Sequence, residues 1–124
     1  NDVGSCGWRT IDIMPQEKRR FIEKIDFVTT PGFLTGPGAR EEAGLPRGTG
    51  PYRVVTNLGV LGFDDETKRM KLLSVNPGVT REQIVENTGF ELLFADEIGE
   101  NPPPTDEELS ILREKVDPDG LYRK

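Results

Sequence analysis

The chain is most apolar between residues 52 and 63, where it reads YRVVTNLGVLGF. Apolar side chains dominate this stretch with little polar interruption, which is typical of a β-strand buried on both faces. A polar turn over residues 64–68 separates it from a second apolar run at residues 70–75. Two apolar runs joined by a short polar turn predict an antiparallel hairpin at the centre of a sheet.

Further strands are predicted on either side of this hairpin. Residues 8–14 alternate between two faces and end at Pro15, which has no amide hydrogen to donate to a sheet. Residues 21–28 are rich in β-favouring side chains and predict another strand, with a helix over residues 16–24 as the alternative. Residues 90–95 predict a strand that follows the hairpin.

Two capping boxes mark the starts of helices. Thr80 is followed three residues later by Gln83, and in such a pair each side chain accepts a hydrogen bond from the other residue's backbone amide. This helix is expected to bury Ile84 and Val85. It is expected to stop at Gly89, because glycine tolerates the left-handed conformation of a helix end.

The second capping box joins Thr105 to Glu108 near the end of the chain. The helix that it starts is expected to end at Asp117-Pro118. It carries one apolar stripe, formed by Leu109, Ile111, Leu112 and Val116. We expect this stripe to dock on the body of the protein or on a partner subunit.

Together these elements predict an α/β fold, with a mixed twisted sheet and flanking helices. Residues 1–95 are expected to form the main part, including a long glycine- and proline-rich loop over residues 31–51 with one helical turn at residues 40–43. Residues 96–124 are expected to form a proline-rich spacer and the C-terminal docking helix.

Composition narrows the classes of function. The 124 residues include 16 basic and 22 acidic side chains that alternate in short clusters, so a nucleic-acid partner is not expected. No apolar run is long enough to span a bilayer and no secretion signal is visible, so we expect a cytoplasmic protein without a membrane partner. Histidine is absent, which excludes Ser-His and Cys-His nucleophilic pairs within the chain.

Isolated residues and short clusters offer little catalytic chemistry. Cys6 is interpreted as a small buried thiol rather than a nucleophile, because no base accompanies it. Glu23 and Asp26 have no visible partner and are assigned to a solvated strand face. The acidic clusters at residues 64–66 and 106–108 lack the spacing of a calcium loop, so no metal site is expected.

Anion binding is the other chemistry considered, for the glycine- and proline-rich loop over residues 31–51 and the arginines in and near it. The glycine-rich residues 44–50 could cradle a phosphate, but they lack the Walker lysine and precede a strand, so a structural turn is favoured. Arg40, Arg47 and Arg53 could bind a carboxylate or phosphate. Solvated charges, or pairs with the neighbouring residues 41–42, are the favoured interpretation.

Three segments together resemble a known family. They are PGFLTGPGAR with GLPRGTGPYRVVTN in residues 31–57, LLSVNPGVT with TGFEL in residues 72–92, and PTDEEL leading to Asp117-Pro118. In order and content they resemble the B subunit of family I CoA-transferases of the glutaconate type. The resemblance implies the NagB/RpiA/CoA-transferase-like fold, present here as a partial domain.

The resemblance also implies a reaction and a set of partners. Such enzymes move coenzyme A between carboxylic acids, with acyl-CoA and a free acid as substrates and no tightly bound cofactor. In their B subunit, a glutamate within a Ser-Glu-Asn-Gly motif becomes a glutamyl-CoA thioester. This motif does not occur here, so no catalytic residue is assigned. The implied partners are the A subunit of the enzyme and the N-terminal half of the B subunit.

The first residues resemble the end of the family's active-site loop. That loop closes in Gly-Gly-Ala-Asn-Asp, and Asn1 and Asp2 resemble its last two residues. The resemblance makes Asn1, Asp2 and Gly4 candidate neighbours of the bound acyl-CoA, at the start of a loop over residues 1–7. It also implies that the chain corresponds to the C-terminal half of the B subunit.

Two alternatives stay open. A ring-cleaving hydrolase branch of the same superfamily, active in steroid breakdown, is similar to residues 54–60 as well. In the second alternative the chain is a non-catalytic module that binds a partner through residues 31–51 and the terminal helix. The substrate acid and the number of assembled copies have no signature in the sequence.

Overall fold

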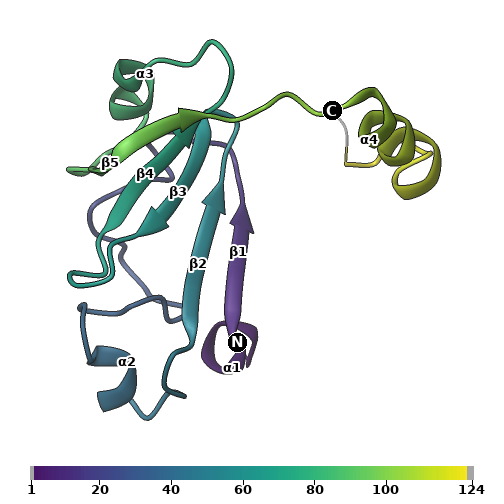
Figure 1. Cartoon of the computed structure of the whole chain (residues 1–124). Coiled ribbons are helices and arrows are strands. Elements are labelled where there is room, and N and C mark those ends of the chain that lie inside the picture. The colour runs from purple at the N-terminus through teal and green to yellow at the C-terminus, as the bar shows by residue number, and fades with distance from the viewer. Residues whose placement is uncertain (1, 123–124) are drawn as a thin grey trace.

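The computed structural model describes residues 2–122. Figure 1 shows a twisted sheet with short helices at its margins and a separate helical tail. In chain order the elements are α1 (Asp2–Cys6), β1 (Arg9–Ile13), α2 (Ala39–Glu42), β2 (Gly50–Val55), β3 (Gly59–Phe63), β4 (Met70–Val75), α3 (Arg81–Glu86), β5 (Leu93–Glu100), α4 (Asp106–Ile111) and the π-helix η1 (Leu112–Val116).

The sheet is mixed, as predicted. Its strand order is β1-β2-β3-β4-β5. The central pairs β2–β3 and β3–β4 are antiparallel, whereas the outer pairs β1–β2 and β4–β5 are parallel. Sequence-adjacent antiparallel strands can be joined by tight turns, but each parallel pair needs a longer connection. The connection from β1 to β2 contains the glycine- and proline-rich loop.

The apolar run at residues 52–63 is two strands rather than the single strand that we predicted. The chain turns at residues 56–58, where the Thr56 hydroxyl oxygen accepts hydrogen bonds from the amides of Leu58 and Gly59 at 3.1 and 3.0 Å. The Thr56 hydroxyl thus takes the place of the backbone carbonyls that would accept from these amides in a continuous strand. The chain can therefore reverse its direction inside an apolar segment. The predicted hairpin between this segment and residues 70–75 is confirmed as β3 and β4.

The core lies on the face of the sheet that α3 covers. Its buried apolar side chains are Phe21, Val54, Leu61, Leu72, Ile84 and Leu92. Leu61 and Leu72 face each other across the β3–β4 pair, and Ile84 of α3 is likewise fully buried. Burying these side chains supplies most of the apolar driving force that holds the helix on the sheet.

Two predictions for the first third of the chain are wrong. Residues 1–7 were expected to be a loop, but Asp2–Cys6 form α1, and the Gly7 amide donates to the Val3 carbonyl at 2.9 Å. The expected strand at residues 21–28 is absent: Phe21 enters the core, Ile22 makes one isolated bridge to Gly89, and the residues beyond are exposed. β-Propensity alone does not make a strand when no neighbouring strand is in register.

The predicted strand at residues 90–95 is displaced along the chain. β5 begins at Leu93 and continues to Glu100, so residues 96–100 belong to the sheet and not to the spacer. Ser74 pairs with Gly99 and Val75 with Glu100 across the parallel β4–β5 ladder. Acidic residues are accommodated because β5 lies at the edge of the sheet, where one side of the strand faces water.

α3 begins as predicted and ends differently. Both hydrogen bonds of the Thr80–Gln83 capping box are present, and Ile84 is buried, but Val85 is half exposed. The expected role of Gly89 is wrong, since its backbone is not left-handed. A Cβ atom there would lie 2.6 Å from the Phe21 carbonyl oxygen, so the glycine permits a close approach of two backbones.

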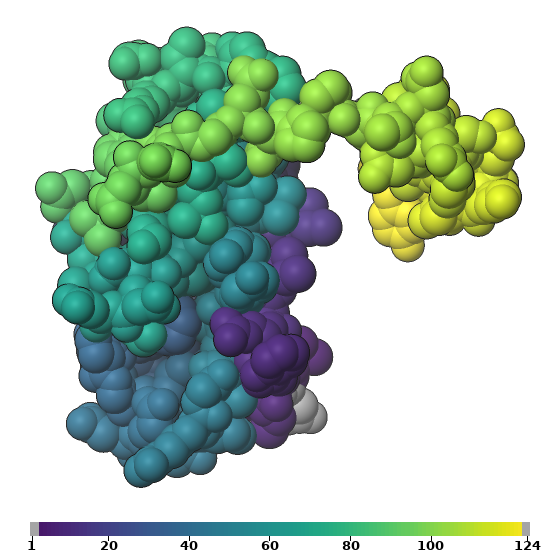
Figure 2. Space-filling model, viewed as in Figure 1, coloured from purple at the N-terminus to yellow at the C-terminus, as the bar shows by residue number. Residues whose placement is uncertain are grey.

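The helical tail stands apart from the sheet. Figures 1 and 2 show α4 and η1 at the end of the extended proline segment, away from the strands. The predicted docking on the body is therefore wrong, and Ile111, Leu112 and Val116 are exposed. The predicted capping box and the end at Asp117 are confirmed. The division of the chain into a main part and a separate tail stays a prediction, with β5 carrying the sheet on to Glu100.

The start of α4 should depend on pH. Hydrogen bonds from the amide and then the hydroxyl of Thr105 lower the pKa of Glu108 from its usual 4.5. Because the folded-state pKa is depressed, the capping box stabilises the helix above pH 4.5, and this stabilisation is lost as the pH falls through the folded-state pKa. We expect the Thr105 amide to lose its protection against hydrogen exchange over that range.

A matched pair of variants tests this pH dependence. Glu108→Gln keeps an acceptor for the Thr105 amide but cannot titrate, so the protection of that amide should become independent of pH. Glu107→Gln should leave the transition unchanged, because Glu107 has no part in the box. Identical pH profiles for the two variants would contradict the assignment.

Candidate functional site

A buried arginine joins the segments around the predicted site. Arg40 lies on α2 and is only 3% exposed. Its Nη1 donates to the carbonyl of Gly32 at 2.8 Å, and its Nη2 donates to the Thr49 hydroxyl oxygen at 2.8 Å. Both nitrogens also lie within 3.4 Å of the Gly4 carbonyl oxygen in α1. One side chain therefore connects α1, the loop before α2, and the start of β2.

This placement corrects the interpretation of Arg40 as a solvated or acid-paired charge. All its acceptors among the described residues are neutral oxygens. A guanidinium offers five N–H groups in a fixed plane, which suits a ring of carbonyls that come from different segments. Its Nε is the one buried side-chain nitrogen or oxygen of the described residues without a hydrogen-bond partner.

Two of the predicted site residues, Asp2 and Gly4, lie in α1. Asn1 lies outside the described residues, and Asp2 begins α1, with its side chain outside the description. Gly4 is buried, and Arg40 donates to its carbonyl. Their role beside an acyl-CoA stays a prediction, but the structure holds Gly4 in a defined position.

A cavity of about 820 Å³ opens beside Gly4. Its walls include Val3 from α1, Thr10 and Ile11 from β1, and Pro31 from the loop. The lining of this cavity, which is partly open to solvent, combines apolar side chains with a few polar groups. Asp12 contributes the one carboxylate among its lining residues.

A second cavity, of about 590 Å³, shares Arg9 and Pro51 with the first. Arg53 lines this second cavity, as does Arg40, whereas Arg47 lines neither and is exposed. The three arginines that the sequence offered as anion ligands are therefore not brought together. The cationic side chains that sequence reasoning missed are Arg9, Lys68 and Lys71. They lie far apart in the chain, so no local pattern could have grouped them.

The structure also places the other residues that the sequence analysis considered for catalysis or binding. Cys6 is exposed, which contradicts its interpretation as a buried thiol. Glu23 and Asp26 are exposed as expected, although not on a strand. Gly44 and Gly48 have left-handed backbones, in agreement with the turn predicted for residues 44–50. Among residues 2–122, no group of three or more potential ligands is placed to bind a metal, and no helix is long and apolar enough to cross a membrane.

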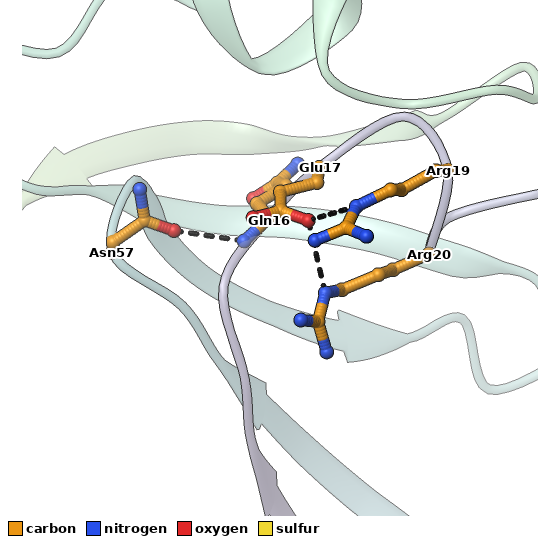
Figure 3. Close-up of polar contacts among 5 residues, drawn as sticks. All are labelled: Gln16, Glu17, Arg19, Arg20 and Asn57. Carbon is orange, nitrogen blue, oxygen red and sulfur yellow. Dashed lines mark hydrogen bonds and ion pairs between the residues drawn. The ribbon is translucent and has the colours of Figure 1, made fainter.

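A polar cluster follows β1 (Figure 3). Gln16 is buried, with its amide donating to Asn57 at 2.8 Å and its side chain donating to the Thr88 hydroxyl at 3.0 Å. Glu17 accepts from Arg19 and Arg20 at 2.6 and 3.0 Å, which lowers its pKa. Glu17 is thus held as a carboxylate and is a poor general acid. Gln16 connects three segments of the fold.

These features define an α/β domain with ligand-sized cavities at one end of a mixed sheet. The model of the Coenzyme A transferase family matches residues 3–87, and the chain belongs to this family. The resemblance seen in the sequence is thereby confirmed, and so is its fold.

Three relatives illustrate the match. The chain is 47% identical to the glutaconate CoA-transferase B subunit of Acidaminococcus fermentans over 91% of its own length and 42% of that relative's. The crystal structure of that glutaconate coenzyme A-transferase superposes with a TM-score of 0.90, covering all of this chain and 47% of the other. The 3-oxoadipate CoA-transferase B subunit of Pseudomonas knackmussii is 39% identical over 90% of this chain and 43% of its own length.

The third relative is Rhodococcus jostii IpdAB, a cholesterol ring-cleaving hydrolase. Its crystal structure superposes with a TM-score of 0.73 and 34% identity, over 91% of this chain and 45% of the other. The chain spans less than half the length of each of these relatives.

Proposed function

We propose that the chain is the C-terminal portion of the B subunit of a CoA-transferase that moves coenzyme A between carboxylic acids. The observation that carries this proposal is the TM-score of 0.90, over the whole chain, with glutaconate coenzyme A-transferase. Relatives named for glutaconate and 3-oxoadipate support a dicarboxylic acid as one substrate. Coenzyme A enters as a thioester substrate.

In this proposal the chain supplies walls and supports rather than the nucleophile. The cavity that Gly4 lines receives the reacting end of the acyl-CoA, and the resemblance to the family makes Asn1, Asp2 and Gly4 its expected neighbours. Arg40 keeps α1 in place. The glutamate that forms the glutamyl-CoA thioester belongs to the part of the B subunit that the relatives carry beyond the matched region.

Exposed apolar surfaces support the proposed partners. β1 lies at the sheet edge, and Ile11 and Ile13, which share one face of the strand, are exposed by 59 and 82%. We assign this surface to the N-terminal half of the B subunit, because an uncovered apolar edge strand tends to aggregate. We assign the exposed stripe of α4 and η1 to the A subunit. A cytoplasmic setting is part of the same proposal.

Mass spectrometry and an exchange assay on one preparation test the function. The assembled protein is identified by native and denaturing mass spectrometry, then given glutaconyl-CoA and acetate. We expect acetyl-CoA to form and a CoA adduct to appear on a glutamate of the companion polypeptide. Without acetate no acetyl-CoA should form. An assembled complex that transfers coenzyme A to no carboxylate would overturn the proposal.

Ring-cleaving hydrolysis is the second candidate, favoured by the match to IpdAB. A hydrolase would give no acetyl-CoA and would convert a cyclic-ketone acyl-CoA into a product heavier by one water. The third possibility, a non-catalytic interaction module, would give neither product while a stable complex was still seen in the native spectrum.

A further inference from the structure

The cavity that Gly4 lines has one cationic side chain in its wall. Among the described residues that line it, Arg9 is the one base and Asp12 the one acid. The remaining walls are formed by apolar side chains, threonines, prolines and glycines. Arg9 and Asp12 both lie on β1, the edge strand that follows α1 (Figure 1). A negatively charged group in this cavity therefore has Arg9 as its one counter-charge from the described part of the chain.

The charge of Arg9 is not neutralised by an acid. Among residues 2–122, no carboxylate lies within ion-pair distance of its guanidinium. Asp12 lies three residues further along the strand, and side chains three apart on a strand point to opposite faces. Arg9 is also exposed, so its guanidinium can be reached by a ligand. The cation is thus available for an anion that enters from outside the chain.

Two aromatic rings orient the Arg9 side chain. Its guanidinium carbon lies 5.2 Å from the centre of the Trp8 ring and 4.8 Å from the centre of the Tyr52 ring. Such cation–π contacts restrict the side chain without removing its charge. The N–H groups of a guanidinium form a planar fork that matches both oxygens of a carboxylate. A guanidinium that is already oriented loses less entropy when it forms this pair.

We propose that Arg9 binds the distal carboxylate of a dicarboxylic acyl group, which is the carboxylate that does not carry coenzyme A. This assignment rests on the proposed function, in which the cavity receives the reacting end of the acyl-CoA. Moving a free carboxylate from water into a cavity costs free energy unless a cation pairs with it. A bidentate pair with Arg9 offsets this cost for a dicarboxylic acid and gives no such benefit to an uncharged chain of the same length.

The position of Arg9 on β1 agrees with the proposed source of the nucleophile. Arg9 shares a strand face with Ile11 and Ile13, because alternate side chains of a strand point the same way. The proposed function assigns this face to the N-terminal half of the B subunit, and that half also supplies the glutamate. The acyl group then lies between the two parts, with its thioester at the glutamate and its distal carboxylate at Arg9.

Transfer to two acceptors of equal length tests the role of Arg9. The assembled protein is given acetyl-CoA with either glutarate or glutaramate, in which a neutral amide replaces one carboxylate. In both reactions coenzyme A passes from the acetyl group to a carboxylate of the acceptor, and acetate is released. We expect kcat/KM to be about tenfold or more higher for glutarate, since a hydrogen bond to a charged group has this magnitude. Arg9→Gln should lose most of this preference.

Two further variants make the result specific. Arg9→Lys keeps the charge without the planar fork, so it should keep part of the preference for glutarate. Arg81→Gln is the matched control and should keep all of it, because Arg81 also lies over an aromatic ring, Phe94, but lines neither cavity. A thermal melt verifies that each variant is folded.

The outcomes separate this assignment from the proposed function. If the unmodified complex used both acceptors equally, or if Arg9→Gln kept the full preference for glutarate, the role of Arg9 would be wrong and the transferase activity would stand. If the unmodified complex transferred coenzyme A to neither acceptor, the proposed function would be wrong, and the role of Arg9 with it.

Discussion

Replacing Arg40 by alanine should lower the free energy of unfolding by about 3 kcal/mol. The substitution removes the donors that satisfy the buried carbonyl of Gly4, the carbonyl of Gly32 and the hydroxyl of Thr49. It also leaves a gap where three segments meet. Urea denaturation followed by circular dichroism measures the loss, and amide exchange of α1 should increase in parallel because its attachment to the loop is gone.

Two further variants make the Arg40 experiment specific. Arg40→Lys keeps the positive charge but has three donors at a single point, so it should recover only part of the loss. Arg47→Ala removes an exposed arginine from the same loop and should change stability by less than about 0.5 kcal/mol. If Arg40→Ala were no more costly than Arg47→Ala, the connecting role of Arg40 would be wrong.

Truncating Ile84 to alanine should cost about 3 kcal/mol, because its side chain is fully buried between α3 and the sheet and its loss leaves a cavity. The midpoint of urea unfolding reports the change, with an unchanged denaturant slope as evidence that the unfolded state is unaffected. Ile13→Ala is the matched control, since Ile13 is 82% exposed in this chain. If the two substitutions lowered the free energy of unfolding equally, Ile84 would not be part of the hydrophobic core.

Local signals in the sequence predicted local structure well. The strand predicted at residues 8–14 is confirmed as β1, and the hairpin onto residues 70–75 and both capping boxes are confirmed as well. Each of these features depends on residues that are close together in the sequence, where propensity and hydrogen-bonding side chains act directly. The resemblance to the CoA-transferase family was likewise a property of the sequence, and the family match confirms it.

Features that depend on distant partners were predicted poorly. Residues 21–28 have strand propensity, yet no strand of the described chain lies in register with them. The apolar run at residues 52–63 contains a turn because the Thr56 side chain caps it, which apolarity alone does not reveal. The candidate site was predictable only in part, since the supporting role of Arg40 was not predicted and the role of Gly4 beside an acyl-CoA stays a prediction.

The sequence by itself therefore determined the α/β class, the starts of α3 and α4, the central hairpin and the family. Only the tertiary structure decided that Arg40 is buried and that Arg9, Arg53 and Lys68 line one cavity. The physical reason is that removing a charged side chain from water costs free energy. The side chain is buried only where hydrogen-bonding groups offset this cost, and here those groups come from residues remote in the chain. The carbonyls of Gly4 and Gly32 reach Arg40 only after the loop has folded against α1.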